Sequence, residues 1–80
     1  MQKIVIDVRT AVEYEIDHLD SAINIPVEVI HGKIGEVITD KNTPLLVYCA
    51  SGSRSKLAKV LLDRLGYTNV IDGGALKNLK

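Results

Sequence analysis

The chain reads Leu45-Leu46-Val47-Tyr48-Cys49-Ala50-Ser51-Gly52-Ser53-Arg54-Ser55 through its middle, where an apolar run of strand length leads into small polar residues. The apolar run is typical of a buried strand, and the Ser-Gly-Ser after it predicts a tight loop. A helix is predicted from about Arg54 to Leu65, because apolar residues recur at helical spacing at Leu57, Leu61 and Leu65, with Ala58 and Leu62 beside them. Gly66 then occupies the position of a left-handed C-cap. A strand, a loop and a helix in this order form part of an alternating α/β pattern.

A second apolar run, Lys3 to Val8, is rich in β-branched residues and has apolar side chains on both faces. This pattern is typical of a central parallel strand that helices cover on each side. A helix is predicted over 11–17, beginning with a capping box of Thr10 and Glu13. The remaining predicted elements are, in chain order, a strand over 22–25, two short helical pieces within 27–38, a turn over 40–44, a strand over 69–72 and a turn at Gly73-Gly74. The alternation predicts an α/β fold: one small domain spanning residues 1–80, with a mainly parallel central sheet flanked by short helices.

Composition excludes several classes of protein. The 80 residues carry 10 basic and 10 acidic side chains, and this zero net charge argues against nucleic acid or an anionic membrane as a partner. The longest uninterrupted apolar run, Leu45 to Ala50, is too short to cross a bilayer. Cys49 is the single cysteine, so an internal disulfide and a cysteine-based zinc cluster are excluded, and no cofactor or metal is implied. We expect a cytoplasmic protein from the sequence as printed, or a periplasmic one if a signal peptide has been removed.

Cys49 stands at the carboxyl end of the predicted strand, which is where open parallel sheets bind their ligands. The small residues after it can turn tightly enough to point backbone N–H groups at the sulfur, and the start of a helix adds a favourable dipole. Arg54 and Lys56 add positive charge nearby. Such surroundings lower the pKa of a cysteine and favour the reactive thiolate. The alternative is an inert cysteine that closes an apolar strand, since free cysteine is often buried.

Several short motifs follow one another along the chain: Ile6-Asp7-Val8-Arg9, Glu13-Tyr14, His18-Leu19, Ala22-Ile23-Asn24-Ile25-Pro26, the stretch from Val47 to Ser55, Leu65-Gly66-Tyr67-Thr68-Asn69-Val70 and Gly73-Gly74. Taken together they resemble the rhodanese-like domains, and among these the minimal single-domain rhodaneses of the phage shock protein E type. The resemblance covers about Ile4 to Leu76. The chain departs from the family pattern over 17–22, where the usual Gly-His-Ile-Pro-Gly-Ala is replaced by Asp-His-Leu-Asp-Ser-Ala, and it lacks a frequent Trp after the glycine pair.

The resemblance implies a thiosulfate sulfurtransferase. Cys49 is then the catalytic nucleophile, which takes a sulfane sulfur from a small anionic donor such as thiosulfate and holds it as a persulfide. The acceptor is cyanide or a thiol, and a protein acceptor is left open. The expected substrate-binding residues form the loop after the nucleophile, and Arg54 among them helps through its charge: Ala50, Ser51, Gly52, Ser53, Arg54 and Ser55.

Supporting roles are expected for three residues of the first half. Asp7 and Arg9 are interpreted as a structural ion pair at the end of a buried strand, and His18 as a hydrogen-bonding residue within the turn over 19–24. Four acidic residues of this half are interpreted as a solvated face: Glu13, Glu15, Asp17 and Asp20. His31, further along the chain, is expected to be exposed. Ser55 has a second interpretation, as a helix cap.

Two other functions stay open. A persulfide carrier or regulatory interaction module would keep the fold and show little turnover of its own. A cysteine phosphatase is the less favoured alternative, because phosphatase loops place five residues between cysteine and arginine, whereas four lie between Cys49 and Arg54. Tyr48 also stands directly before Cys49, where a phosphatase of this kind has a histidine.

Overall fold

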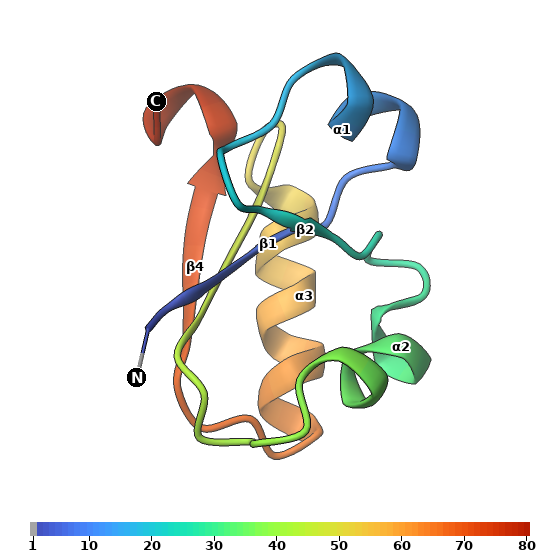
Figure 1. Ribbon diagram of the computed structural model, residues 1–80, viewed down its shortest axis with the longest axis vertical. Coiled ribbons are helices and arrows are strands. Elements are labelled where there is room, and N and C mark those ends of the chain that lie inside the picture. The colour runs from blue at the N-terminus through green and yellow to red at the C-terminus, as the bar shows by residue number, and fades with distance from the viewer. Residues whose placement is uncertain (1) are drawn as a thin grey trace.

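Four parallel strands form a single sheet in the order β2-β1-β3-β4 in the computed structural model, which describes residues 2–80 (Figure 1). The strands are β1 (Ile4–Asp7), β2 (Ile23–Asn24), β3 (Leu45–Cys49) and β4 (Val70–Ala75). The helices are α1 (Ala11–Ile16), α2 (Ile30–Val37) and α3 (Ser53–Arg64), followed by the 3-10 turn η1 (Leu76–Asn78). The alternation of strands and helices around a parallel sheet confirms the predicted α/β fold.

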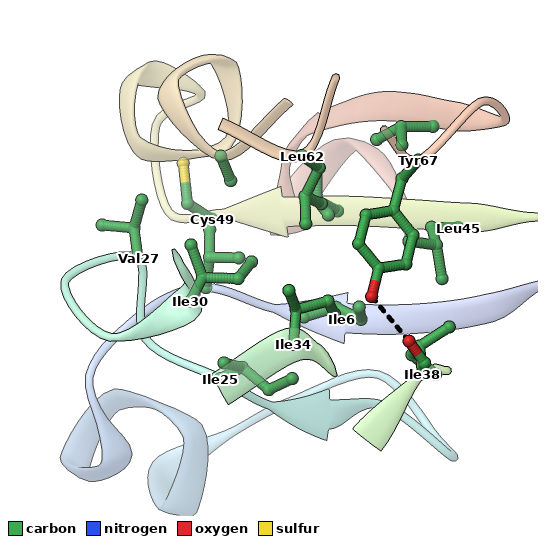
Figure 2. Packing of buried hydrophobic residues seen from close by; sticks show 14 residues of the cluster. Ile6, Ile25, Val27, Ile30, Ile34, Ile38, Leu45, Cys49, Leu62 and Tyr67 are labelled. Atoms are coloured by element: carbon green, nitrogen blue, oxygen red, sulfur yellow. Dashed lines mark hydrogen bonds between the residues drawn. The ribbon is translucent and has the colours of Figure 1, made fainter. Parts of the chain in front are cut away.

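The two faces of the sheet carry separate apolar clusters, as a parallel sheet covered on both sides requires. The larger cluster lies against α2 and α3 and consists of Ile6, Val8, Ile25, Val27, Ile30, Ile34, Ile38, Leu45, Val47, Cys49, Ala58, Leu62, Tyr67 and Val70 (Figure 2). The smaller cluster is built on Ala22, Tyr48 and Leu76. Because side chains alternate along a strand, Cys49 faces the larger cluster and its neighbour Tyr48 faces the smaller one.

The helix ends follow local sequence signals. Thr10 accepts a hydrogen bond from the Glu13 amide while the Glu13 carboxylate accepts one from the Thr10 amide, which confirms the predicted capping box of α1. Gly66 has φ +96°, which confirms the left-handed C-cap after α3. These features depend on residues that are close in the sequence, so the sequence alone reveals them.

Two helical predictions are corrected. Residues 30–37 form one helix, α2, rather than two pieces, because the buried side chains of Ile30 and Ile34 anchor it on one face and its glycines lie on the exposed side. In α3 the predicted leucine stripe does not face the core as a whole: Leu57 is 51% exposed, and the buried positions are Ser55, Ala58 and Leu62.

The predicted turn at Gly73-Gly74 is wrong, because β4 runs through both glycines. Asp72 pairs with Val47 and Gly74 with Tyr48, so Gly73 is an extra residue in a bulge. A Cβ on Gly73 would lie 2.7 Å from the Leu46 side chain and 3.1 Å from the Val47 carbonyl oxygen. The glycine is therefore required for the close approach of β4 to β3, a common reason for glycine within a strand.

Candidate active site

Cys49 is the last residue of β3, and the chain turns directly after it into α3. Gly52 makes this turn with φ +104°, a left-handed conformation that glycine adopts without strain. The turn brings two backbone amides to the sulfur: the N–H of Gly52 donates to Sγ at 3.0 Å and that of Ser55 at 3.3 Å. Figure 2 shows Cys49 at one end of the larger cluster, to which Val27 also belongs. The sulfur thus lies at the carboxyl edge of the sheet, as the sequence predicts.

Two opposing influences act on the ionisation of Cys49. Burial raises the pKa of the thiol and is the largest single influence. Hydrogen bonds from the Ser55 amide and hydroxyl, and from the amides of Gly52 and Ser51, act in the other direction and together outweigh it. The pKa of Cys49 is therefore lowered from its ordinary value, and the surroundings favour the thiolate.

The loop 50–55, which the sequence predicts to bind substrate, forms a cradle at the sulfur with an exposed rim, two half-buried residues, Gly52 and Arg54, and a buried wall. Ala50, Ser51 and Ser53 are exposed, whereas Cys49 and Ser55 have no exposed surface. Ser55 is not the helix cap, because Gly52 occupies that position and makes no side-chain cap. The Ser55 hydroxyl instead donates to the Gly52 carbonyl at 3.0 Å and holds the turn around the sulfur closed.

Arg54 is held by an ion pair to Glu13 on α1. Its Nη1 lies 2.6 Å from Glu13 Oε1 and its Nη2 lies 2.9 Å from Oε2, a two-point geometry that fixes the plane of the guanidinium. These bonds, with one from the Thr10 amide, lower the pKa of Glu13 to about 2. The hydrogen bond to Glu13 also raises the pKa of Arg54. The interpretation of Glu13 as part of a solvated acidic face is therefore wrong, while Glu15, Asp17 and Asp20 are exposed.

Asp7 and Arg9 form the predicted ion pair, and both are buried. Arg9 Nη2 lies 2.7 Å from Asp7 Oδ2, and the Arg9 amide also donates to the same carboxylate at 2.9 Å. The sequence reading missed a third member, Tyr48, whose hydroxyl donates to Asp7 Oδ2 at 2.8 Å and accepts from the Leu19 amide at 3.1 Å. Burial raises the pKa of Tyr48 to about 12, so it stays protonated and remains a donor. The hydroxyl of a buried tyrosine needs a hydrogen-bonding partner. The position of Tyr48 in a predicted buried strand is therefore the one signal in the sequence that could have revealed its bond to Asp7.

His18 lies outside the cradle and bonds elsewhere than predicted. Its Nδ1 lies 2.7 Å from the Tyr14 carbonyl oxygen, and its ring stacks on that of Tyr14 with centroids 3.8 Å apart. His18 therefore caps the end of α1 instead of bonding within the turn over 19–24. His31 is exposed on α2, as expected.

Neither a metal centre nor a membrane span is found in the part of the chain that the structure describes. No group of three or more His, Cys, Asp or Glu side chains within residues 2–80 could hold a metal ion. None of the helices in the same range is long and apolar enough to cross a bilayer.

Comparison with known proteins places the chain in a family. The sequence model of the rhodanese-like domain family matches residues 1–77. The chain belongs to the rhodanese-like domain family. One relative of this rhodanese-like chain is the thiosulfate sulfurtransferase PspE of Escherichia coli, 40% identical over 74 residues, which cover 92% of this chain and 71% of that protein.

Solved rhodanese structures agree with this assignment. A rhodanese from Escherichia coli, solved with anions, superposes with a TM-score of 0.92 at 39% identity, covering 96% of this rhodanese-like chain and 91% of that one. Another match is the tRNA uridine(34) hydroxylase of Buchnera aphidicola, 32% identical over 83 residues. The aligned region is only 27% of that hydroxylase, so the likeness concerns one part of a larger protein.

Proposed function

We propose that residues 1–80 form one rhodanese-like domain that acts as a thiosulfate sulfurtransferase through a persulfide on Cys49. One observation carries the proposal: the sulfur of Cys49 accepts hydrogen bonds from two backbone amides at the start of α3, with its pKa lowered. The similarity to PspE, which is named a thiosulfate sulfurtransferase, supports the choice of donor.

The chemistry follows from the ionised sulfur. The thiolate of Cys49 attacks the outer sulfur of thiosulfate, a new S–S bond forms, and the S–S bond of the donor breaks with its electron pair leaving on sulfite. The persulfide then gives its outer sulfur to cyanide, which leaves as thiocyanate and restores the thiolate. Charge and atoms balance in both steps, and no further oxidant or reductant is needed. Because a covalent intermediate separates two half-reactions, ping-pong kinetics are expected.

The backbone amides around Cys49 serve both states of the enzyme. They stabilise the attacking thiolate, and the persulfide is again an anion at the same edge of the sheet. Arg54 is the one residue with a charged side chain in the loop 50–55. Only two of its five N–H donors are bonded to Glu13, so the others are left to contact the oxygen atoms of an anionic donor. We assign Ala50, Ser51, Gly52 and Ser53 to the rim that receives the donor.

The supporting residues act at a distance from the sulfur. Asp7, Arg9 and Tyr48 join β1, β3 and the connection after α1 through buried hydrogen bonds. Their part in the reaction is to fix the end of β3 and with it the position of Cys49. His18 stabilises the end of α1 and contacts Tyr14, so we assign it no role in proton transfer.

The function is tested by exposing the purified protein to thiosulfate and measuring its intact mass. We expect a gain of one sulfur atom, about 32 Da, its loss on addition of cyanide, and equimolar thiocyanate. Cys49→Ser should abolish both the mass gain and thiocyanate formation, while its circular dichroism spectrum stays that of the parent. Loading without discharge to cyanide would indicate the carrier function instead. Thiocyanate formation by the Cys49→Ser variant would contradict the mechanism.

A phosphatase is tested with an aryl phosphate in the same preparation. Four residues between Cys49 and Arg54 leave a shorter loop than the five of cysteine phosphatases. We therefore expect no hydrolysis above that of the Cys49→Ser variant. Hydrolysis that depends on Cys49 would favour the phosphatase.

A further inference from the structure

The ion pair between Glu13 and Arg54 joins two elements that are distant in the sequence. Glu13 belongs to α1 and Arg54 to the first turn of α3, 41 residues later. Both side chains are partly accessible, with 29% of the Arg54 side chain and 33% of the Glu13 side chain exposed. The pair is therefore partly open to solvent beside the turn that encloses Cys49, and the charge of Arg54 interacts with that of Cys49.

The pair changes the charge that such an anion encounters. Arg54 is the one charged residue among residues 50–55, and the carboxylate of Glu13 cancels its charge at a distance of 2.6 Å. The Arg54 charge interacts with Glu28, a second carboxylate, and with Cys49 itself. Lys56 is a nearby cation in the sequence, but it is exposed on α3. Arg54 and Glu13 together therefore add no net positive charge at the loop. Backbone amides consequently supply most of the attraction for an anionic donor.

We propose that Glu13 is a specificity-determining residue: by neutralising and orienting Arg54, it reduces the preference of the Cys49 site for doubly charged sulfur donors over singly charged ones. This inference rests on the proposed sulfurtransferase function. The electrostatic energy of a donor in the field of Glu13 scales with the charge of the donor, so a dianion is disfavoured twice as strongly as a monoanion. Monoanionic sulfane-sulfur compounds, such as organic thiosulfonates RSO₂S⁻, are therefore expected to serve as donors beside thiosulfate, with a smaller disadvantage than in the absence of the Glu13 charge.

Transfer from a thiosulfonate follows the same chemistry as transfer from thiosulfate. The Cys49 thiolate attacks the terminal sulfur, the new S–S bond forms, and the bond between the two sulfur atoms of the donor breaks with its electron pair on the departing sulfinate RSO₂⁻. The terminal sulfur and its negative charge remain on Cys49 as the persulfide. Thiosulfate and a thiosulfonate thus deliver the same atom and differ by one unit of charge, which makes them a matched pair of donors.

The capping box of α1 allows the charge of Glu13 to be removed without removing its structural role. Glutamine is accepted at the same capping position as glutamate, so Glu13→Gln keeps the hydrogen bond from the Thr10 amide. Thr10→Ala is the reverse control, because it removes the cap and retains the charge. Glu15→Gln removes an equal charge from an exposed position of the same helix, for which no ion pair is recorded within residues 2–80.

The first experiment measures the potential at the sulfur and needs no sulfurtransferase activity. Cys49 is alkylated with iodoacetate, an anion, and with iodoacetamide, which is neutral and of similar size. The ratio of the two rates cancels the ionisation and the accessibility of Cys49, since both reagents react with the same thiolate. At low ionic strength we expect Glu13→Gln to raise the ratio about threefold, as removal of one charge at partly screened range predicts. The ratio should stay at the parent value in Glu15→Gln and Thr10→Ala.

The second experiment measures donor selectivity. kcat/KM is determined for thiosulfate and for benzenethiosulfonate with cyanide as acceptor. Glu13→Gln should raise the ratio of thiosulfate to thiosulfonate about threefold at low salt, and the gain should fall as salt is added. An unchanged alkylation ratio together with equal losses of kcat for both donors would show that Glu13 is only structural and would overturn the proposal. An equal rise in Glu13→Gln and Glu15→Gln would overturn it as well, because the effect would then belong to the net charge of the protein.

Failure of this inference can be distinguished from failure of the proposed function. If the parent protein takes no sulfur from either donor, the sulfurtransferase function is wrong, and the alkylation ratio alone still decides whether Glu13 sets the potential at Cys49. If the parent turns over both donors and Glu13→Gln leaves their ratio unchanged, the function stands and the role of Glu13 is wrong.

Discussion

Replacement of Ser55 by alanine removes one hydroxyl group from the wall around Cys49 and leaves the backbone N–H that donates to the sulfur. Ser55 is fully buried, its amide nitrogen lies 3.3 Å from Sγ, and its hydroxyl donates to the Gly52 carbonyl at 3.0 Å. The same hydroxyl lowers the pKa of Cys49. Its loss destabilises the thiolate relative to the thiol, and the pKa of Cys49 in Ser55→Ala should therefore rise.

The size of this rise follows from the energy of one hydrogen bond. A hydrogen bond to a charged group contributes about 1.5–3 kcal/mol, which corresponds to roughly one to two pKa units. The proton of the Ser55 hydroxyl is donated to the Gly52 carbonyl, which limits its influence on the sulfur, so we expect the lower end, about one unit. At pH values below the parent pKa, the fraction of thiolate should fall about tenfold. Well above both pKa values it should be unchanged, because the sulfur is then ionised in both proteins.

The assay is the rate of alkylation by iodoacetamide as a function of pH. Its midpoint reports the pKa of Cys49, while its plateau at high pH reports access to the enclosed sulfur. Ser53→Ala is the matched control, since Ser53 belongs to the same turn, is exposed, and has the Ser51 hydroxyl, 3.5 Å away, as its recorded side-chain contact. Its midpoint should equal that of the parent.

Three results would refute the reasoning. A Ser55→Ala midpoint equal to that of the parent would mean that the hydroxyl does not stabilise the thiolate. An equal rise in Ser55→Ala and Ser53→Ala would assign the effect to a general loosening of the turn. A change in plateau without a change in midpoint would show that Ser55 controls access to Cys49 and not its ionisation.

The buried network around Tyr48 and the bulge at Gly73 should both contribute to stability. Tyr48→Phe removes a donor to the buried Asp7 carboxylate and the acceptor of a backbone amide, so it should lower the free energy of unfolding by about 2–4 kcal/mol. Tyr14→Phe removes one bond to a carbonyl and should cost about 1 kcal/mol; equal losses in urea unfolding would contradict the importance of the buried network. Gly73→Ala should destabilise the protein by about 1–3 kcal/mol, because its Cβ would overlap β3. Gly35→Ala, at an open helical position, should instead raise the free energy of unfolding by about 0.5–1 kcal/mol and with it the thermal midpoint. A higher thermal midpoint in both glycine variants would contradict the role of Gly73 in the bulge.

Features that depend on neighbouring residues can be read directly from the sequence. The apolar runs before Asp7 and Cys49 are long enough to indicate buried strands, and the capping box at Thr10 marks the start of α1. The position of Cys49 follows for the same reason, since a strand, a small-residue turn and a helix leave the sulfur at one edge of the sheet. Local hydrogen bonds and side-chain periodicity decide these features, and both can be read from short segments.

Tertiary structure alone decided which distant groups meet. Glu13 and Arg54 are 41 residues apart, as are Asp7 and Tyr48, and neither pair has a local signal. Both pairs form because β1 and β3 pair in parallel. Asp7 lies opposite Tyr48 in the register, and the segments after the two strands, which carry Glu13 and Arg54, are brought together. The bulge at Gly73 has the same origin, since the packing of β4 against a leucine of β3 determines whether the chain turns there or continues. Contacts of this kind depend on the sheet register, which is fixed only when the strands have assembled.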